Sequence, residues 1–158
     1  MALSLDQENI VQLIGFHVGP KLLGADILTI REILREPEVG EAIAAPRFVE
    51  GITQLRGQVI PIVNLGHLMG VSPSTVGQEK SWVLVAQAGS RQVGYRVDSV
   101  TPILRVREDT ILPAPDIILS GLRSKYIRGV TETQRGLLVV VDLERMLNDE
   151  EVAALDRL

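Results

Sequence analysis

The 158-residue sequence contains no cysteine, and it has only one Trp, two Tyr, two Phe and two His. Without cysteine the chain can form no disulfide, thiolate metal site, thiol nucleophile or CxxC redox pair, which is typical of a protein in a reducing compartment such as the cytoplasm. The motifs GxxxxGK[ST], HExxH, GxSxG and GxGxxG are also missing. Phosphate cradles, zinc-protease sites and nucleophile elbows therefore have no support in the sequence.

Long apolar runs and clusters of basic residues are equally scarce. No uncharged run approaches the ~20 residues that a membrane-spanning helix needs, and the start, MALSLDQENI, does not have the pattern of a signal peptide. We therefore expect neither secretion by that route nor integration into a membrane. The net charge is −4 and the arginines are scattered, which argues against a nucleic-acid or anionic membrane surface. Protein partners or small ligands are the expected binding partners.

What the chain does contain is an internal repeat. FVEGITQLRGQVIPIVNLGHLM (48–69) aligns with YIRGVTETQRGLLVVVDLERML (126–147), so that Gly51 matches Gly129. Self-similarity of this kind indicates that two parts of a chain form related structural units.

A second pair of segments extends the repeat. GADILTIREIL (24–34) aligns with GYRVDSVTPIL (94–104), and the two blocks follow in the same order in both halves. Nothing between the halves has the composition of a flexible linker. We therefore predict one domain, residues 1–158, built from two intertwined β-rich units at about 24–69 and 94–147.

The repeat also resolves one ambiguity of secondary structure. Ile27, Ile30 and Ile33 have helical spacing, but the matching segment carries Pro102, which is incompatible with the interior of a helix. Both segments are therefore predicted to run as strand, tight turn and strand. Other short, β-branched segments bounded by Gly, Pro, Asn or Asp predict further strands, arranged in small barrels. Capping residues at Asn148 predict a C-terminal helix at about 149–157.

Isolated polar residues give little sign of catalysis. The histidines His17 and His67 lack a second histidine or an acid cluster nearby in sequence, so surface or partly buried positions are the simpler interpretation. The three aspartates Asp26, Asp98 and Asp142 follow predicted strands, where Asp commonly bonds to the local backbone.

The dipeptide Arg56–Gly57 requires more explanation. A tight hairpin between GITQL and QVIPIVNL needs the positive φ that Gly57 allows, but it asks nothing of the residue before it. An exposed arginine in a turn is ordinary. Alternatively, a rigid hairpin presents the planar guanidinium of Arg56 to a carboxylate or carbonyl of a partner. The residues alone leave both interpretations open.

Several motifs together resemble a known family. LGADILTIREIL, APRFVEGITQLRGQVIPIVNL, VGYRVDSV, PAPDI, YIRGV and GLLVVVDLERML, in this order, closely resemble the bacterial chemotaxis coupling proteins of the CheW family. The resemblance runs from about Ile10 to the C-terminus. It implies an all-β fold of two SH3-like five-stranded β-barrels packed around a shared hydrophobic core, with short helices and a C-terminal helix.

The resemblance further implies a non-enzymatic adaptor without catalytic residues, cofactor or metal. Such an adaptor couples the cytoplasmic tips of methyl-accepting chemotaxis receptors to the regulatory domain of the histidine kinase CheA. It also helps to build the receptor–kinase arrays at the membrane, without inserting into the membrane or binding nucleic acid.

Binding residues are implied by position in the family motifs. The receptor would contact a groove between the barrels, formed by Arg56, Gly57, Glu32 and Ile30, with Ile103 and Trp82 on the other wall. The regulatory domain of CheA, or the ring that it forms with the adaptor, would contact Val39, Ile43 and Ile117.

Two other function classes are alternatives to the adaptor. A small-ligand sensor could bind an anion through Arg56, but the sequence shows few aromatics and no cluster of polar groups that converges with this arginine. A hydrolase that used Ser99, His67 and Asp98 would match no known motif spacing.

Overall fold

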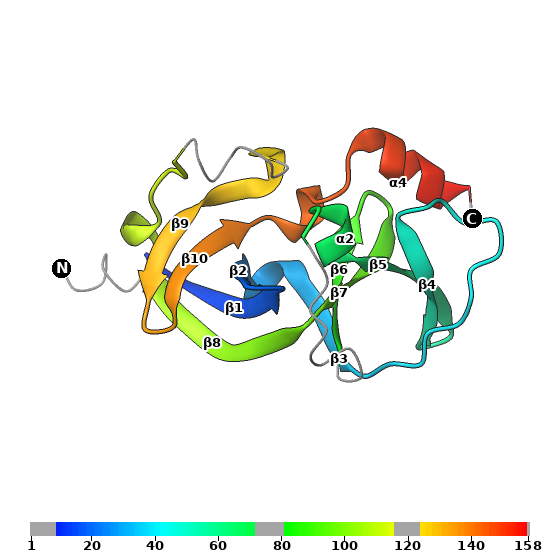
Figure 1. Cartoon of the computed structure of the whole chain (residues 1–158), viewed down its shortest axis with the longest axis horizontal. Helices are drawn as coiled ribbons and strands as arrows, with labels where there is room; N and C mark the ends of the chain where they lie inside the picture. Colours follow the sequence, from blue (N-terminus) through cyan, green and yellow to red (C-terminus); the bar gives the residue numbers. More distant parts are fainter. Residues whose placement is uncertain (1–8, 72–80, 116–123, 158) are drawn as a thin grey trace.

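The computed structural model describes residues 9–71, 81–115 and 124–157. These residues form ten β-strands and a few short helices (Figure 1). The strands are β1 (Ile10–Val18), β2 (Lys21–Asp26), β3 (Ile30–Arg35), β4 (Val49–Leu55), β5 (Gln58–Asn64), β6 (Trp82–Ala88), β7 (Arg91–Val97), β8 (Ser99–Arg107), β9 (Ile127–Thr133) and β10 (Gly136–Val141). The helices are α2 (Leu65–Leu68), α4 (Asp149–Asp156) and the 3-10 turns η1 (Ile27–Thr29), η2 (Glu108–Thr110), η3 (Ser124–Tyr126) and η4 (Leu143–Arg145).

The strands form two five-stranded sheets, which occupy the two lobes seen in Figure 1. Sheet A has the order β8-β1-β2-β10-β9, and sheet B has the order β3-β6-β7-β5-β4. Each sheet contains one parallel pair, β2 with β10 and β5 with β7, among antiparallel neighbours. In the described residues the outer strands of a sheet do not pair with each other, so the barrels are not strictly closed. The predicted all-β fold with short helices and a C-terminal helix is confirmed.

The chain crosses between the sheets at two equivalent places. After β2 of sheet A, the turn η1 leads into β3 of sheet B, and after β7 of sheet B, Asp98 leads into β8 of sheet A. This is the strand, turn and strand arrangement that Pro102 predicts, and the proline lies on an edge strand, where its missing N–H is tolerated. The crossovers are held by Asp26, which accepts a hydrogen bond from the Leu28 amide, and by Asp98, which accepts one from the Gly19 amide.

The repeated glycines Gly51 and Gly129 allow two segments of backbone to approach closely. A Cβ on Gly51 would lie 2.5 Å from the carbonyl oxygen of Gly40, and one on Gly129 would press against the carbonyl oxygen of Leu112. At both places the crossing chain forms an isolated β-bridge with the residue after the repeated glycine. The glycines therefore let the segment that follows β3 or β8 cover the edge of β4 or β9.

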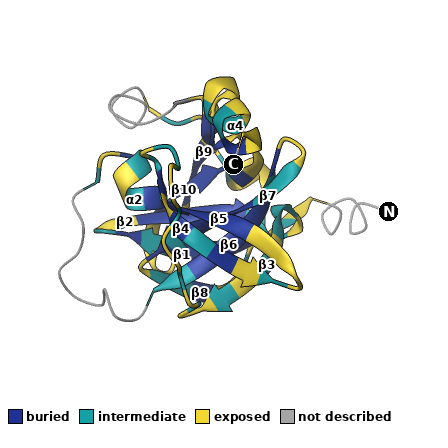
Figure 2. Cartoon of the chain, turned by 90° about the vertical axis from the view of Figure 1, so that its right-hand side faces the viewer, coloured by how far each residue is buried: buried dark blue, intermediate teal, exposed yellow. Residues whose placement is uncertain are grey.

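The largest group of buried side chains lies between the sheets. It includes Phe16 and Leu23 from sheet A, Leu84 and Tyr95 from sheet B, and Leu155 from α4. Two smaller clusters fill the separate lobes, one from sheet A and one from sheet B. Figure 2 shows the consequence: the central strands are mostly buried, whereas β3, β8 and the outer face of α4 are largely exposed.

The C-terminal helix α4 begins with a capping box. Asn148 accepts a hydrogen bond from the Glu151 amide, and the Glu151 carboxylate accepts one from the Asn148 amide. Val152 packs against the shared core, and Leu155 is fully buried. Within the described ranges, no helix combines the length and apolar character needed to cross a bilayer.

Candidate partner-binding site

The hairpin that joins β4 to β5 has an unusual turn. Leu55 pairs with Gln58, which leaves Arg56 and Gly57 as the two central residues. Their φ angles are 52° and 79°, as in a type I′ turn. The sequence-based expectation that the turn asks nothing of Arg56 is therefore wrong, because both central residues adopt the left-handed conformation. For an L-residue with a Cβ this conformation costs about 1–2 kcal/mol.

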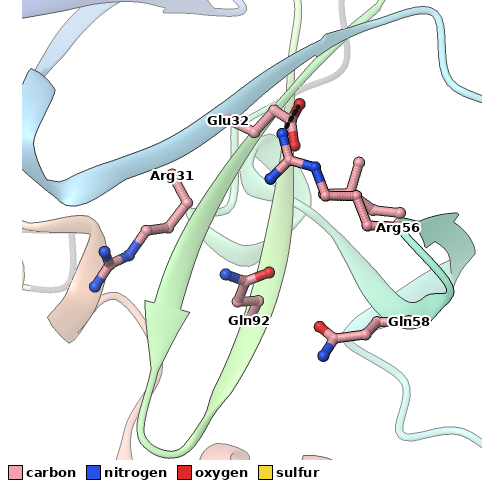
Figure 3. A pocket seen from close by; sticks show the side chains of 6 residues that line it. Arg31, Glu32, Arg56, Gln58 and Gln92 are labelled. Atoms are coloured by element: carbon pink, nitrogen blue, oxygen red, sulfur yellow. Dashed lines mark hydrogen bonds and ion pairs between the residues drawn. The ribbon is translucent and has the colours of Figure 1, made fainter.

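Arg56 reaches from the turn to the edge strand β3. Its Nη2 atom lies 3.3 Å from Oε1 of Glu32, as Figure 3 shows. The Arg56 side chain is 80% exposed and the Glu32 side chain 27% exposed, so water screens this ion pair and its contribution to folding is under about 1 kcal/mol. Most of the guanidinium donors stay open to a partner, although the pair fixes where the group lies.

Glu32 has a second feature. Its other carboxylate oxygen, Oε2, is buried and has no hydrogen-bond partner among the described residues. An unpaired buried acceptor costs free energy, so a further donor at this position would be favourable.

Side chains from β3 and from three other strands surround the pair. Arg31 of β3, Leu55 of β4, Gln58 of β5 and Gln92 of β7 complete the lining of a shallow pocket of about 200 Å³ around Glu32 and Arg56. In Figure 3 the Arg31 guanidinium points away from Arg56, while Gln92 lies between Arg31 and Arg56 and Gln58 lies below Arg56. The expectation that no polar groups converge with Arg56 is therefore wrong. Gln58 lies two residues after Arg56 in the same hairpin, but the sequence gives no signal for Gln92, which comes from β7, far along the chain.

The apolar residues that the family resemblance assigns to receptor binding do not line this pocket. Ile30 is on the same strand as Glu32 and packs against the shared core, as does Trp82 at the start of β6. The Arg35 guanidinium lies 5.4 Å from the centroid of the Trp82 ring. Ile103 lies on β8 of sheet A and is exposed, where it lines a different groove.

Two of the residues that the resemblance assigns to kinase binding lie in the loop between β3 and β4. Val39 is half-buried and packs against the small cluster of sheet B, whereas Ile43 is 90% exposed. Ala44, next to Ile43, has a φ of 59°, so this loop also holds a non-glycine residue in the left-handed conformation. Ile117 lies outside the described residues.

The residues considered for a hydrolase do not form a triad. Ser99 Oγ lies 3.0 Å from Nδ1 of His17, not of His67, and the carboxylate of Asp98 accepts a hydrogen bond from the Gly19 amide. The contact between His17 and Ser99 spans 82 residues and had no sequence signal. The described residues contain no group of three or more His, Cys, Asp or Glu that could hold a metal ion.

Comparison with known proteins places these features in a family. The model of the CheW-like domain family matches residues 12–151. The chain is 33% identical over 141 residues to chemotaxis protein CheW of Klebsiella aerogenes, with 89% of this chain and 84% of that protein covered. It is 34% identical over 142 residues to chemotaxis protein CheW of Rhizobium meliloti, with 89% of each covered.

A solved structure has the same fold. The crystal structure of the scaffolding protein TtCheW from Thermoanaerobacter tengcongensis superposes with a TM-score of 0.77 at 21% identity. The superposition covers 89% of this chain and 94% of that one.

Proposed function

The chain belongs to the CheW-like domain family, whose members are non-enzymatic adaptors, and we propose that it couples methyl-accepting chemotaxis receptors to the histidine kinase CheA. The observation that carries the proposal is the position of Arg56. A mostly exposed arginine occupies a strained turn position and is directed by Glu32 at one end of sheet B. Strain of this kind at an exposed tip is better explained by binding than by folding.

The proposed receptor-binding surface is centred on Arg56 and Glu32. A receptor tip is a helical hairpin, and a helix offers backbone and side-chain acceptors to a guanidinium. Arg56 and Gly57 would contact the helix from the turn, and Glu32 would fix the orientation of Arg56. Apolar contacts would come from Ile30, Ile103 and Trp82.

The kinase side is proposed on a separate surface. The regulatory domain of CheA would contact the loop between β3 and β4 through Val39 and Ile43. The 90% exposure of Ile43 supports this, because an exposed isoleucine gains free energy when a partner covers it. A proposed contact through Ile117 rests on the family resemblance alone.

The location and organisation of the chain follow from the same proposal. We place it in the cytoplasm, at receptor–kinase arrays beneath the membrane. We also propose that residues 1–158 form one domain of two intertwined units, about 24–69 and 94–147. The equivalent crossovers between sheets after β2 and β7 support this division.

A small-ligand sensor is less well supported. The pocket at Arg56 is about 200 Å³, smaller than typical small-molecule sites of roughly 300–1,000 Å³, and Leu55 is its one apolar lining residue. Such a pocket suits a side chain of a protein partner better than a buried metabolite.

The test compares wild type with Arg56→Ala in binding to a soluble receptor signalling fragment and, separately, to the CheA regulatory domain. We expect Arg56→Ala to weaken receptor binding by about 1–3 kcal/mol, roughly 5–150-fold, and to leave kinase binding unchanged. Arg128→Ala is the control, since Arg128 is exposed on β9 of sheet A. Circular dichroism checks that all variants are folded.

Two outcomes would contradict the proposal. If wild type binds neither partner, the chain shares the fold but not the coupling role. If Arg56→Ala binds the receptor fragment as tightly as wild type, Arg56 is not the docking residue.

A further inference from the structure

A second groove lies on sheet A, between β8 and the β9–β10 hairpin. It has a volume of about 580 Å³, and in Figure 1 the hairpin descends beside β8. It is lined by residues 103–106 of β8 and residues 132–135 of the hairpin. The Arg56 pocket is lined by residues of sheet B, and the two pockets share no lining residue, although Ile103 of this groove is also a proposed receptor contact.

The floor of this groove is apolar. Leu104 and Val106 are half-buried and pack against the small core cluster of sheet A. Ile103, at one end, is 47% exposed. An apolar side chain placed in the groove would therefore leave water and contact the edge of the lobe core.

The walls carry more positive than negative charge. Arg105 on β8 and Arg135 in the hairpin are exposed, and neither forms an ion pair with a residue that the structure describes. Glu132 is the one acid among the lining residues, so the groove has an excess of one positive charge.

The repeat shows why the turn arginine Arg135 has no acidic partner on the edge strand. In the first half of the chain the turn arginine Arg56 is paired with Glu32 on the edge strand β3. In the alignment of 24–34 with 94–104, Glu32 corresponds to Pro102 on the edge strand β8. The second half therefore has a proline where the first half has the carboxylate.

We propose that this groove docks an acidic, amphipathic segment of a partner protein. An apolar side chain of the segment would lie over Leu104 and Val106, and two flanking carboxylates would pair with Arg105 and Arg135. Charge complementarity favours an acidic partner, whereas the acid in the wall and the net charge of −4 disfavour nucleic acid. A free small anion would leave the apolar floor uncovered. The proposal does not depend on the function of the Arg56 site.

The test is an NMR titration of the ¹⁵N-labelled full chain with two blocked synthetic peptides. One alternates Glu and Leu, and the other has Gln in place of every Glu. The expected result is that the Glu peptide shifts the amide signals of residues 103–106 and 132–135 and leaves that of Arg56 unchanged. The Gln peptide is expected to give no shifts at these positions.

Two double variants test the charges. Arg105→Glu with Arg135→Glu is expected to weaken binding of the Glu peptide about tenfold or more, because attraction becomes repulsion. Arg47→Glu with Arg128→Glu makes the same change of net charge at exposed arginines outside the groove, and it should leave the affinity nearly unchanged.

Several results would overturn the proposal. They are the absence of shifts in wild type, shifts that map outside the groove, equal binding of the Gln peptide, and equal losses in both double variants. Glutarate that gives the same shifts with the same affinity as the Glu peptide would identify a small-anion site instead. No receptor or kinase is used, so failure here is distinct from failure of the adaptor proposal.

Discussion

Glu32 and Arg56 are 24 residues apart in the chain, yet their side chains meet at 3.3 Å. The contact joins the edge strand β3 to the tip of the β4–β5 hairpin, across a part of sheet B that strand pairing leaves open. It positions a guanidinium that is still mostly exposed, which is the arrangement expected of a docking residue rather than of a buried structural one.

Relief of the strain at this turn should stabilise the protein. Arg56→Asn replaces an arginine at a φ of 52° by a residue that tolerates the left-handed conformation. We expect the free energy of unfolding to rise by up to about 1 kcal/mol, because the strain exceeds the small contribution of the exposed ion pair. Urea denaturation of wild type and Arg56→Asn measures this difference in the free energy of unfolding. A fall in stability would show that the ion pair with Glu32 outweighs the strain.

The close backbone crossings should not tolerate a methyl group. Gly51→Ala and Gly129→Ala place a Cβ against a backbone carbonyl oxygen, and each should lower the free energy of unfolding by about 1–3 kcal/mol. The control is Gly40→Ala, at the same crossing, where the new Cβ would lie 3.8 Å from Ile52. Equal losses in Gly40→Ala and Gly51→Ala, measured by chemical denaturation, would refute the close approach.

The cap of α4 can be tested by itself. Asn148→Ala removes the acceptor for the Glu151 amide, and it should lower stability by about 0.5–2 kcal/mol. Asn148→Asp retains an acceptor and should change stability little. Hydrogen exchange of the α4 amides measures the local effect. Unchanged protection in Asn148→Ala would show that packing of Val152 and Leu155, not the cap, holds the helix.

Trp82 offers a spectroscopic probe because it is the single tryptophan. Arg35→Ala removes the guanidinium near its ring, so we expect a change in tryptophan emission and a loss of about 0.5–1 kcal/mol in stability. Arg31→Ala, on the same strand, serves as the control and should leave the emission unchanged. Identical spectra for wild type and Arg35→Ala would argue against the contact.

Much of the fold could be predicted because the decisive signals are local or repeated. Pro102 excluded a helix in one half and, through the repeat, in the other. Asn148 marked the start of the C-terminal helix, and Gly57 marked the hairpin. Each depends on the conformation that one residue type allows.

The site was harder to predict because its members come from different strands. The alternation of each strand can be read along the chain, but which strands become neighbours depends on the packing of both sheets. Gln92 reaches the Arg56 pocket, and His17 reaches Ser99, only through such pairing. The left-handed conformation of Arg56 was missed because the following glycine accounted for the turn.

By itself, the sequence determined the absence of thiol chemistry, the two repeated halves, the strand-rich class and the family, since these follow from residue types and their order. Only the tertiary structure decided that Glu32 would pair with Arg56 while Arg105 and Arg135 find no acid among the described residues. The physical reason is that ion pairs form between side chains that folding brings within a few ångströms, and that proximity is set by how the sheets exchange strands, not by separation along the chain.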